Sequence, residues 1–179
     1  KYSYEYITEV LKVDKDKLWF TVYKDDDEAY DIWKNVIGVP EKRIQRGNED
    51  NFWHMNIPGP CGPCSEIFID RGSKYGEDGG PIGGGEDRFI EIWNLVFMES
   101  IQDQPFQVID ELPKKNIDTG MGLERIAMIM QDKDNLFDTD LFKPLHDALL
   151  SKITVNDNKY EKIIIDHIKS STFMISDGV

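Results

Sequence analysis

The segment of residues 89–98 constrains the fold more than any other, because all of it is apolar except for Glu91 and Asn94. A strand with one wet face alternates apolar and polar residues, whereas a strand covered on both faces is apolar almost throughout. The segment therefore predicts a central strand of a sheet. It also implies that other parts of the chain cover both faces of that sheet.

Glu91 and Asn94 are the two polar residues of this predicted strand. Burying an unpaired polar group costs a few kcal/mol, so each needs a partner in the protein or in a ligand. Strict alternation puts the two side chains on opposite faces of a strand. They can share one site only across a bulge or at a strand end.

Strands and helices are interspersed before residue 135, and helices alone follow. We expect further strands at 18–23, 65–70, 106–112 and near Asn116, helices at 1–12, 25–38, 120–131, 141–153 and 160–176, and loops at 58–63 and 71–87. This order predicts an α+β domain over residues 1–135. Residues 136–179 are expected to begin an all-helical domain.

The composition limits the classes of partner. The chain has 179 residues, with 21 Lys and Arg against 34 Asp and Glu and a net charge of −13. An acidic chain is unsuited to binding nucleic acid or an anionic membrane on its own, since both need a basic face. No apolar run has the length of a membrane span, and the first residues carry no signal peptide or initiator Met. We expect a piece of a larger cytoplasmic protein.

The two cysteines lie in one motif, Cys61-Gly62-Pro63-Cys64, which matches the redox motif of thioredoxin. That chemistry needs a thiolate stabilised at a helix N-terminus, and the residues that follow here alternate like a strand. A zinc site is also disfavoured, because the histidines show no finger-like spacing to this single cysteine pair. A structural turn with two small buried thiols is favoured, in a reducing compartment.

A second motif, Asp118-Thr119-Gly120, spells the triplet of aspartic proteases. Those enzymes need two such Asp residues that share a proton, and the chain has one triplet. The residues after it, up to Arg125, read instead as a strand-to-helix junction with two glycines. Such a junction lets a ligand approach the backbone and offers free N–H groups and an arginine to a phosphate. By pattern alone, a tight structural junction with an exposed arginine is equally consistent.

Taken together, four motifs resemble the bacterial alanyl-tRNA synthetase family in order and spacing. They are residues 51–53, 59–67, 91–98 and 118–125, with shorter matches at 19–23, 26–30, 166–168 and 177–179. The resemblance covers essentially the whole chain. Each motif is weak alone, but several in one order are highly specific.

The resemblance implies a class II aminoacyl-tRNA synthetase, whose antiparallel sheet is flanked by helices. Such enzymes join an amino acid to ATP as an adenylate with Mg²⁺, and then transfer it to the 3′ end of tRNA. The partners implied are alanine, ATP, the tRNA for alanine and the rest of a longer chain. The family's first two signature motifs, with an arginine on the ATP α-phosphate, are not among these residues.

The resemblance also implies roles for single residues. Residues 118–131 would be the third class II signature, in which Gly120, Gly122 and Arg125 bind ATP and Arg125 contacts the γ-phosphate. The pocket for alanine would be lined by Trp53, Asn94, Asp118 and Gly120, and Glu91 would help to bind both ATP and Mg²⁺. Asp118 suits the ammonium group of alanine, and we expect its carboxylate to be buried.

Two alternatives to a ligase remain open from the sequence. One is a non-catalytic remnant that keeps the synthetase fold as a binding module. The other is a thiol–disulfide oxidoreductase that uses Cys61 and Cys64.

Overall fold

The computed structural model describes residues 1–153 and 157–179. The chain divides into two compact units, Lys1–Gly122 and Leu123–Val179, and each is described by itself. The boundary expected near residue 135 concerns functional domains and stays a prediction.

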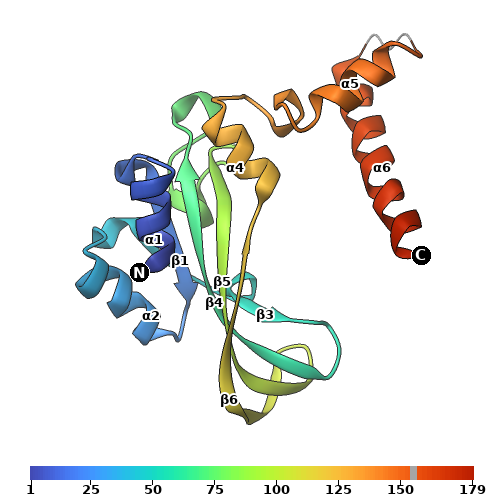
Figure 1. The fold of residues 1–179 in the computed structure, drawn as a ribbon. Coiled ribbons are helices and arrows are strands. Elements are labelled where there is room, and N and C mark those ends of the chain that lie inside the picture. Colours follow the sequence, from blue (N-terminus) through green and yellow to red (C-terminus); the bar gives the residue numbers. More distant parts are fainter. Residues whose placement is uncertain (154–156) are drawn as a thin grey trace. The chain divides into compact units, whose positions relative to one another are not determined.

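Within the described residues, the first unit contains one six-stranded sheet (Figure 1). Its strands are β1 (Leu18–Tyr23), β2 (Ile44–Gly47), β3 (Phe52–His54), β4 (Gly59–Asp70), β5 (Phe89–Gln104) and β6 (Gln107–Met121). The order is β2-β1-β4-β5-β6, and β3 pairs with the first part of β4. Every pair is antiparallel except β1 and β2, which are parallel. The predicted α+β class is confirmed, and β5 has a strand on each side as its apolar sequence indicated.

Two helical segments flank this sheet where the sequence predicted them. The first is α1 (Tyr2–Glu5), which continues as a π-helix over Tyr6–Val10, and the second is α2 (Asp27–Asp31), which continues as a π-helix over Ile32–Ile37. Asp26 caps α2 by accepting the N–H of Ala29 at 2.8 Å. The segment ends at Gly38, whose φ of 82° suits glycine. Short helical turns occur at Lys15–Lys17, Glu41–Arg43, Glu49–Asn51 and Ser73–Tyr75, and α3 covers Gly80–Gly83.

Both helical segments pack on one face of the sheet (Figure 1). The ring of Trp33 lies 4.2 Å from that of Phe20, and its Nε1 donates to Ser65 Oγ at 2.8 Å. Tyr6 meets Trp93 edge-on at 5.9 Å. Neighbouring residues on a strand point to opposite faces. The strand residues next to Phe20, Ser65 and Trp93 therefore point away from the helices.

The structure corrects the loop predicted at 58–63, because β4 runs through it from Gly59. The backbone there pairs with β3 on one side and β5 on the other, and an irregularity in the ladder lies between Cys61 and Cys64. Proline is tolerated in a strand at such a bulge, where its missing N–H breaks no ladder bond. Long-range pairing thus overrides the local preference of Gly62 and Pro63 for a turn.

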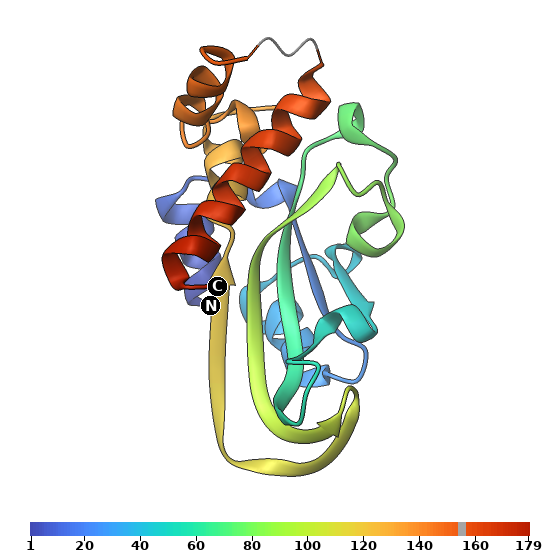
Figure 2. The same cartoon turned by 90° about the vertical axis from the view of Figure 1, so that its right-hand side faces the viewer.

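The two strands predicted at 106–112 and near Asn116 are one strand, β6, joined to β5 by a tight hairpin (Figure 2). β6 lies at the edge of the sheet, where Pro113 is acceptable because its N side needs no partner. The helix expected from Gly120 begins later, because Gly120 and Met121 still belong to β6.

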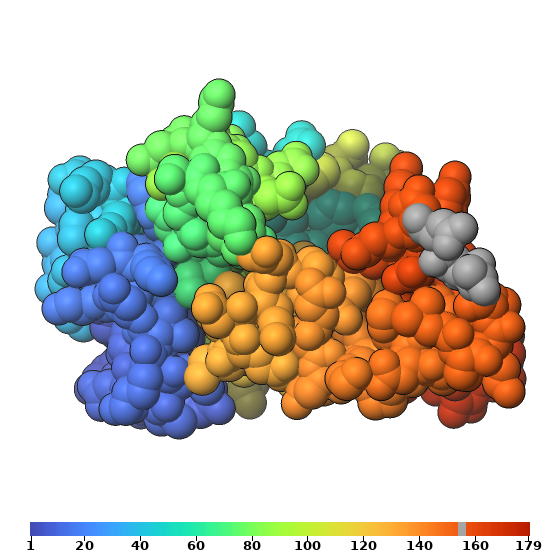
Figure 3. All heavy atoms as spheres, turned by 90° about the horizontal axis from the view of Figure 1, so that it is seen from above, coloured from blue at the N-terminus to red at the C-terminus, as the bar shows by residue number. Residues whose placement is uncertain are grey.

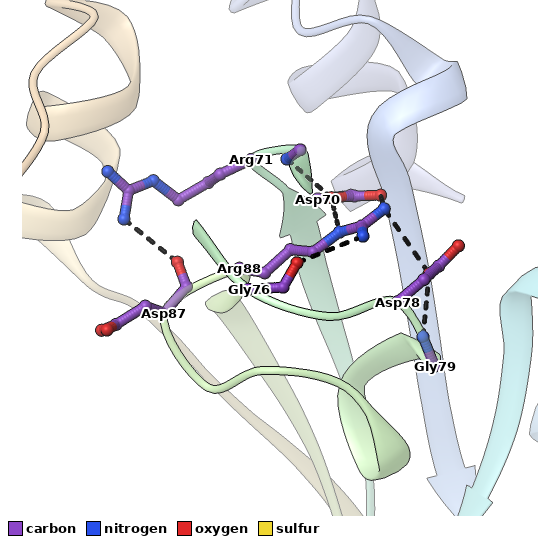
Figure 4. Close-up of polar contacts among 8 residues, drawn as sticks. Asp70, Arg71, Gly76, Asp78, Gly79, Asp87 and Arg88 are labelled. Carbon is purple, nitrogen blue, oxygen red and sulfur yellow. Dashed lines mark hydrogen bonds and ion pairs between the residues drawn. The ribbon is translucent and has the colours of Figure 1, made fainter. Parts of the chain in front are cut away.

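The connection between β4 and β5 is a surface segment, as predicted (Figure 3). It is tied at its base by Arg88, whose guanidinium donates to both carboxylate oxygens of Asp70 at 2.7 and 2.9 Å and reaches Gly76 O and Asp78 (Figure 4). The hydrogen bonds from Arg88 hold the pKa of Asp70 below its usual value. A bidentate hydrogen-bonded ion pair of this kind is stronger and more directional than an ion pair with a single contact.

The second unit is helical, with α4 (Leu123–Met130), α5 (Lys143–Leu150) and α6 (Asn158–Asp177). A small core forms between α5 and α6 from Phe142, Leu149 and Ile165. A short helical turn, Leu136–Asp138, precedes α5 and is capped by Asn135. In the two described ranges, no helix is long and apolar enough to cross a membrane.

Candidate active site

A row of small and polar residues crosses the sheet on the face opposite the helices. Thr21 of β1 lies opposite Glu66 of β4, Glu66 opposite Asn94 of β5, and Asn94 opposite Gly120 of β6. Directly opposite residues of an antiparallel pair share one face. Four strands that are far apart in sequence therefore place these residues side by side.

Glu91 joins this face through a bulge in β5. Glu91 pairs with Phe68 and Trp93 pairs with Ile67, so Ile92 has no opposite residue. One extra residue reverses the alternation that would otherwise separate Glu91 from Asn94. The bulge that the sequence required for a shared site is present.

Trp53 and Asn94 line the same cavity, which has a volume of about 430 Å³. Its other lining residues are Glu49, Asp50, Phe52, His54, Asn56, Cys64, Pro105 and Phe106. Asn94 Oδ1 is buried and has no hydrogen-bond partner among the described residues. Such an acceptor is costly unless a donor reaches it. The arrangement suits a ligand that carries an N–H group.

Glu66 is a buried charged residue on this face that the sequence motifs did not single out. It is 9% exposed and accepts hydrogen bonds from Thr21 Oγ1 at 2.9 Å, Asn51 Nδ2 at 3.2 Å and Asn94 Nδ2 at 3.3 Å. Burial raises the pKa of Glu66 to about 7, and the negative charge of Glu91 adds to that rise. The signal was available, because Glu66 is the one charged residue between Cys64 and Ile69.

Asp118 and Gly120 lie on the same face as Asn94, at the edge of the sheet. Asp118 is opposite Val96, one alternation away from the pair of Asn94 and Gly120. Its burial was predicted wrongly, because β6 is an edge strand and the side chain is exposed. Asp118 Oδ1 accepts the N–H of Thr119 at 2.8 Å.

The remaining predicted ATP residues lie at the end of β6 and beyond it. Gly122 follows the strand and donates its N–H to Ile92 O at 3.3 Å. Arg125 belongs to the second unit, in the first turn of α4, and is exposed. Its role toward ATP stays a prediction.

The cysteines lie in a strand, not at a helix N-terminus. Burial raises the pKa of the Cys61 thiol, and burial together with the charge of Glu66 raises the pKa of Cys64 to about 12. A redox cysteine needs the opposite shift, toward the thiolate. No cluster of three or more His, Cys, Asp or Glu that could hold a metal occurs in the described part of the chain.

A sheet that is antiparallel apart from one pair, flanked by helices and carrying a polar row, matches the class expected from the sequence motifs. A sequence model described as class II (A) tRNA synthetases matches residues 1–179, and the chain belongs to that family. Class II synthetases use ATP and a divalent metal in general.

Curated relatives are similar over almost all of this chain. It is 50% identical over 179 residues to the alanine--tRNA ligase of Corynebacterium glutamicum (strain R), covering 93% of this chain and 20% of the relative. It is 51% identical over 181 residues to that of Corynebacterium diphtheriae, covering 94% and 20%. It is 49% identical over 178 residues to the alanine--tRNA ligase of Thermobifida fusca, covering 93% of this chain and 20% of the relative. The chain thus spans about a fifth of the length of these relatives.

Proposed function

We propose that this chain is part of an alanine–tRNA ligase, which activates alanine with ATP and transfers it to the 3′ end of its tRNA. The observation that carries the proposal is the identity of about 50% over 93% of the chain to proteins of that name. The sheet face with Glu66, Asn94 and Gly120 supports it, because these residues lie side by side there and Asn94 also lines a cavity.

In this proposal, Trp53, Asn94, Asp118 and Gly120 bind alanine. The ammonium group of alanine donates to Asn94 Oδ1, which lacks a donor within the described chain. The Asp118 carboxylate neutralises the ammonium charge from the same face. Gly120 has no atom within 4 Å of the position that a Cβ would occupy, so its backbone is open to a ligand.

ATP is bound by Gly120, Gly122 and Arg125 in the same proposal, with Glu91 as an Mg²⁺ ligand. Mg²⁺ is commonly held by one or two carboxylates together with substrate phosphates, so one half-buried glutamate fits such a site. When bound, the metal offsets the negative charge of the triphosphate. Arg125 offers a planar, fork-shaped donor to the γ-phosphate.

The remaining partners follow from the same assignment. The chain carries a net charge of −13, so we expect the basic surface that contacts tRNA to lie elsewhere in the longer protein. Residues 136–179 would begin the helical domain that recognises tRNA. A cytoplasmic location agrees with two unpaired, buried cysteines.

The test is alanine-dependent exchange of pyrophosphate into ATP by the full-length protein that contains this chain. We expect exchange with alanine and little with larger amino acids. A folded protein that binds neither alanine nor ATP would instead favour the non-catalytic remnant. Insulin reduction that depends on Cys61 and Cys64 would favour an oxidoreductase.

A further inference from the structure

Asn94 can accept a hydrogen bond from a ligand in the cavity in only one of the two orientations of its carboxamide. Its Nδ2 lies 3.3 Å from Glu66 Oε1, and its Oδ1 is buried without a partner. Above its pKa of about 7, the ionised Glu66 carboxylate only accepts hydrogen bonds, so it requires the NH₂ group of the Asn94 amide to face it. Glu66 therefore leaves Asn94 Oδ1 as the buried atom of this amide that has no donor among the described residues.

Glu66 is itself held rigidly by two buried residues. Its Oε2 accepts from Thr21 Oγ1 at 2.9 Å and from Asn51 Nδ2 at 3.2 Å, and Asn51 Nδ2 also donates to Thr21 Oγ1 at 2.7 Å. Thr21 is 1% exposed and Asn51 is 2% exposed. Asn51 in turn packs against Gly47, where a Cβ would lie 1.9 Å from Asn51 Oδ1.

We propose that Glu66 is a positioning residue for alanine, which orients the Asn94 carboxamide through a buried network with Thr21 and Asn51. This inference rests on the proposed function, since alanine supplies the ammonium group that Asn94 Oδ1 accepts. Glu66 acts through Asn94 and does not itself contact the substrate. Geometry held by such supporting groups decides how precisely a site binds its ligand.

Glu66→Gln tests the inference with the smallest change. The glutamine amide has the shape of the carboxylate but can donate to Asn94 Oδ1, which lets the Asn94 carboxamide turn over. In full-length protein, we expect the KM for alanine to rise about tenfold, with the KM for ATP nearly unchanged. A purely structural role predicts a changed melting temperature with an unchanged KM for alanine, and that result would overturn the proposal.

A second pair of variants decides the question even if Glu66→Gln does not fold. Thr21→Val removes a donor to Glu66 and keeps the shape of the side chain. Ser65→Ala is the matched control, because Ser65 is equally buried but bonds Trp33 and Thr21 O on the helix-covered face. We expect both to lower the melting temperature and only Thr21→Val to raise the KM for alanine. Equal KM values for the two variants would refute the positioning role.

The wild-type protein distinguishes a failure of the proposed function from a failure of the role proposed for Glu66. If it shows no alanine-dependent exchange, the proposed function fails. If it is active and Glu66→Gln binds alanine normally, only the role of Glu66 fails.

Discussion

At the scale of single residues, Asp118 is the sharpest test of the alanine pocket. It is exposed and its Oδ1 accepts a backbone N–H, a contact that asparagine can keep, so Asp118→Asn should change stability by less than about 0.5 kcal/mol. The lost charge should lower kcat/KM for alanine by roughly 10²-fold and leave the KM for ATP nearly constant. Exchange kinetics with a melting curve would measure both. Normal alanine kinetics would remove Asp118 from the site.

Arg125 should affect ATP and not alanine. Arg125→Lys keeps the charge but loses the planar fork, so we expect the KM for ATP to rise about tenfold or more. Arg125→Ala should be worse than the lysine variant. Steady-state exchange at varied ATP checks this order, and an unchanged KM for ATP in both variants would contradict it.

Cys61 and Cys64 should contribute through packing alone. Their buried thiols have raised pKa values, so a double Ser variant should lose stability without losing any redox activity. Metal analysis of the wild-type protein supplies the second measurement. Stoichiometric zinc that disappears in the double variant would show that the cysteines bind metal.

At the scale of elements, the pairing of β4 with β5 depends on Gly62. A Cβ there would lie 2.0 Å from Phe97 O, a backbone atom that cannot move without disturbing the ladder. Gly62→Ala should therefore destabilise the protein by roughly 3 kcal/mol. The control is Gly83→Ala, where a Cβ would have nothing within 4 Å. Urea unfolding of both variants measures the difference in stability. Equal midpoints would show that the ladder between β4 and β5 accommodates a Cβ at Gly62.

At the scale of the whole molecule, Glu66 should make stability depend on pH. Its pKa is about 7 in the folded protein against 4.5 for an unperturbed glutamate, so the folded state binds more protons between these values. Stability therefore falls as pH rises through this window, by roughly 3 kcal/mol. Glu66→Gln cannot titrate, so it should be relatively more stable at pH 8 than at pH 4. Unfolding of both proteins at the two pH values measures this, and parallel curves would contradict it.

Elements with local signals could be predicted from the sequence. The helical segment that ends at Gly38, the strand at 18–23 and the surface connection after Asp70 all appear at the positions predicted from the sequence. The requirement that Glu91 and Asn94 meet across a bulge was also local. It follows from alternation and from the cost of burying polar groups.

Features that depend on distant partners could not be predicted in this way, because they arise on folding. β4 passes through a Gly-Pro segment because β3 and β5 pair with it, and Asp118 is exposed because β6 is an edge strand. Glu66 became part of the site because Thr21, Asn51 and Asn94 converge on it from three other segments. Local propensity does not encode such convergence, because sheet pairing joins residues that lie far apart along the chain.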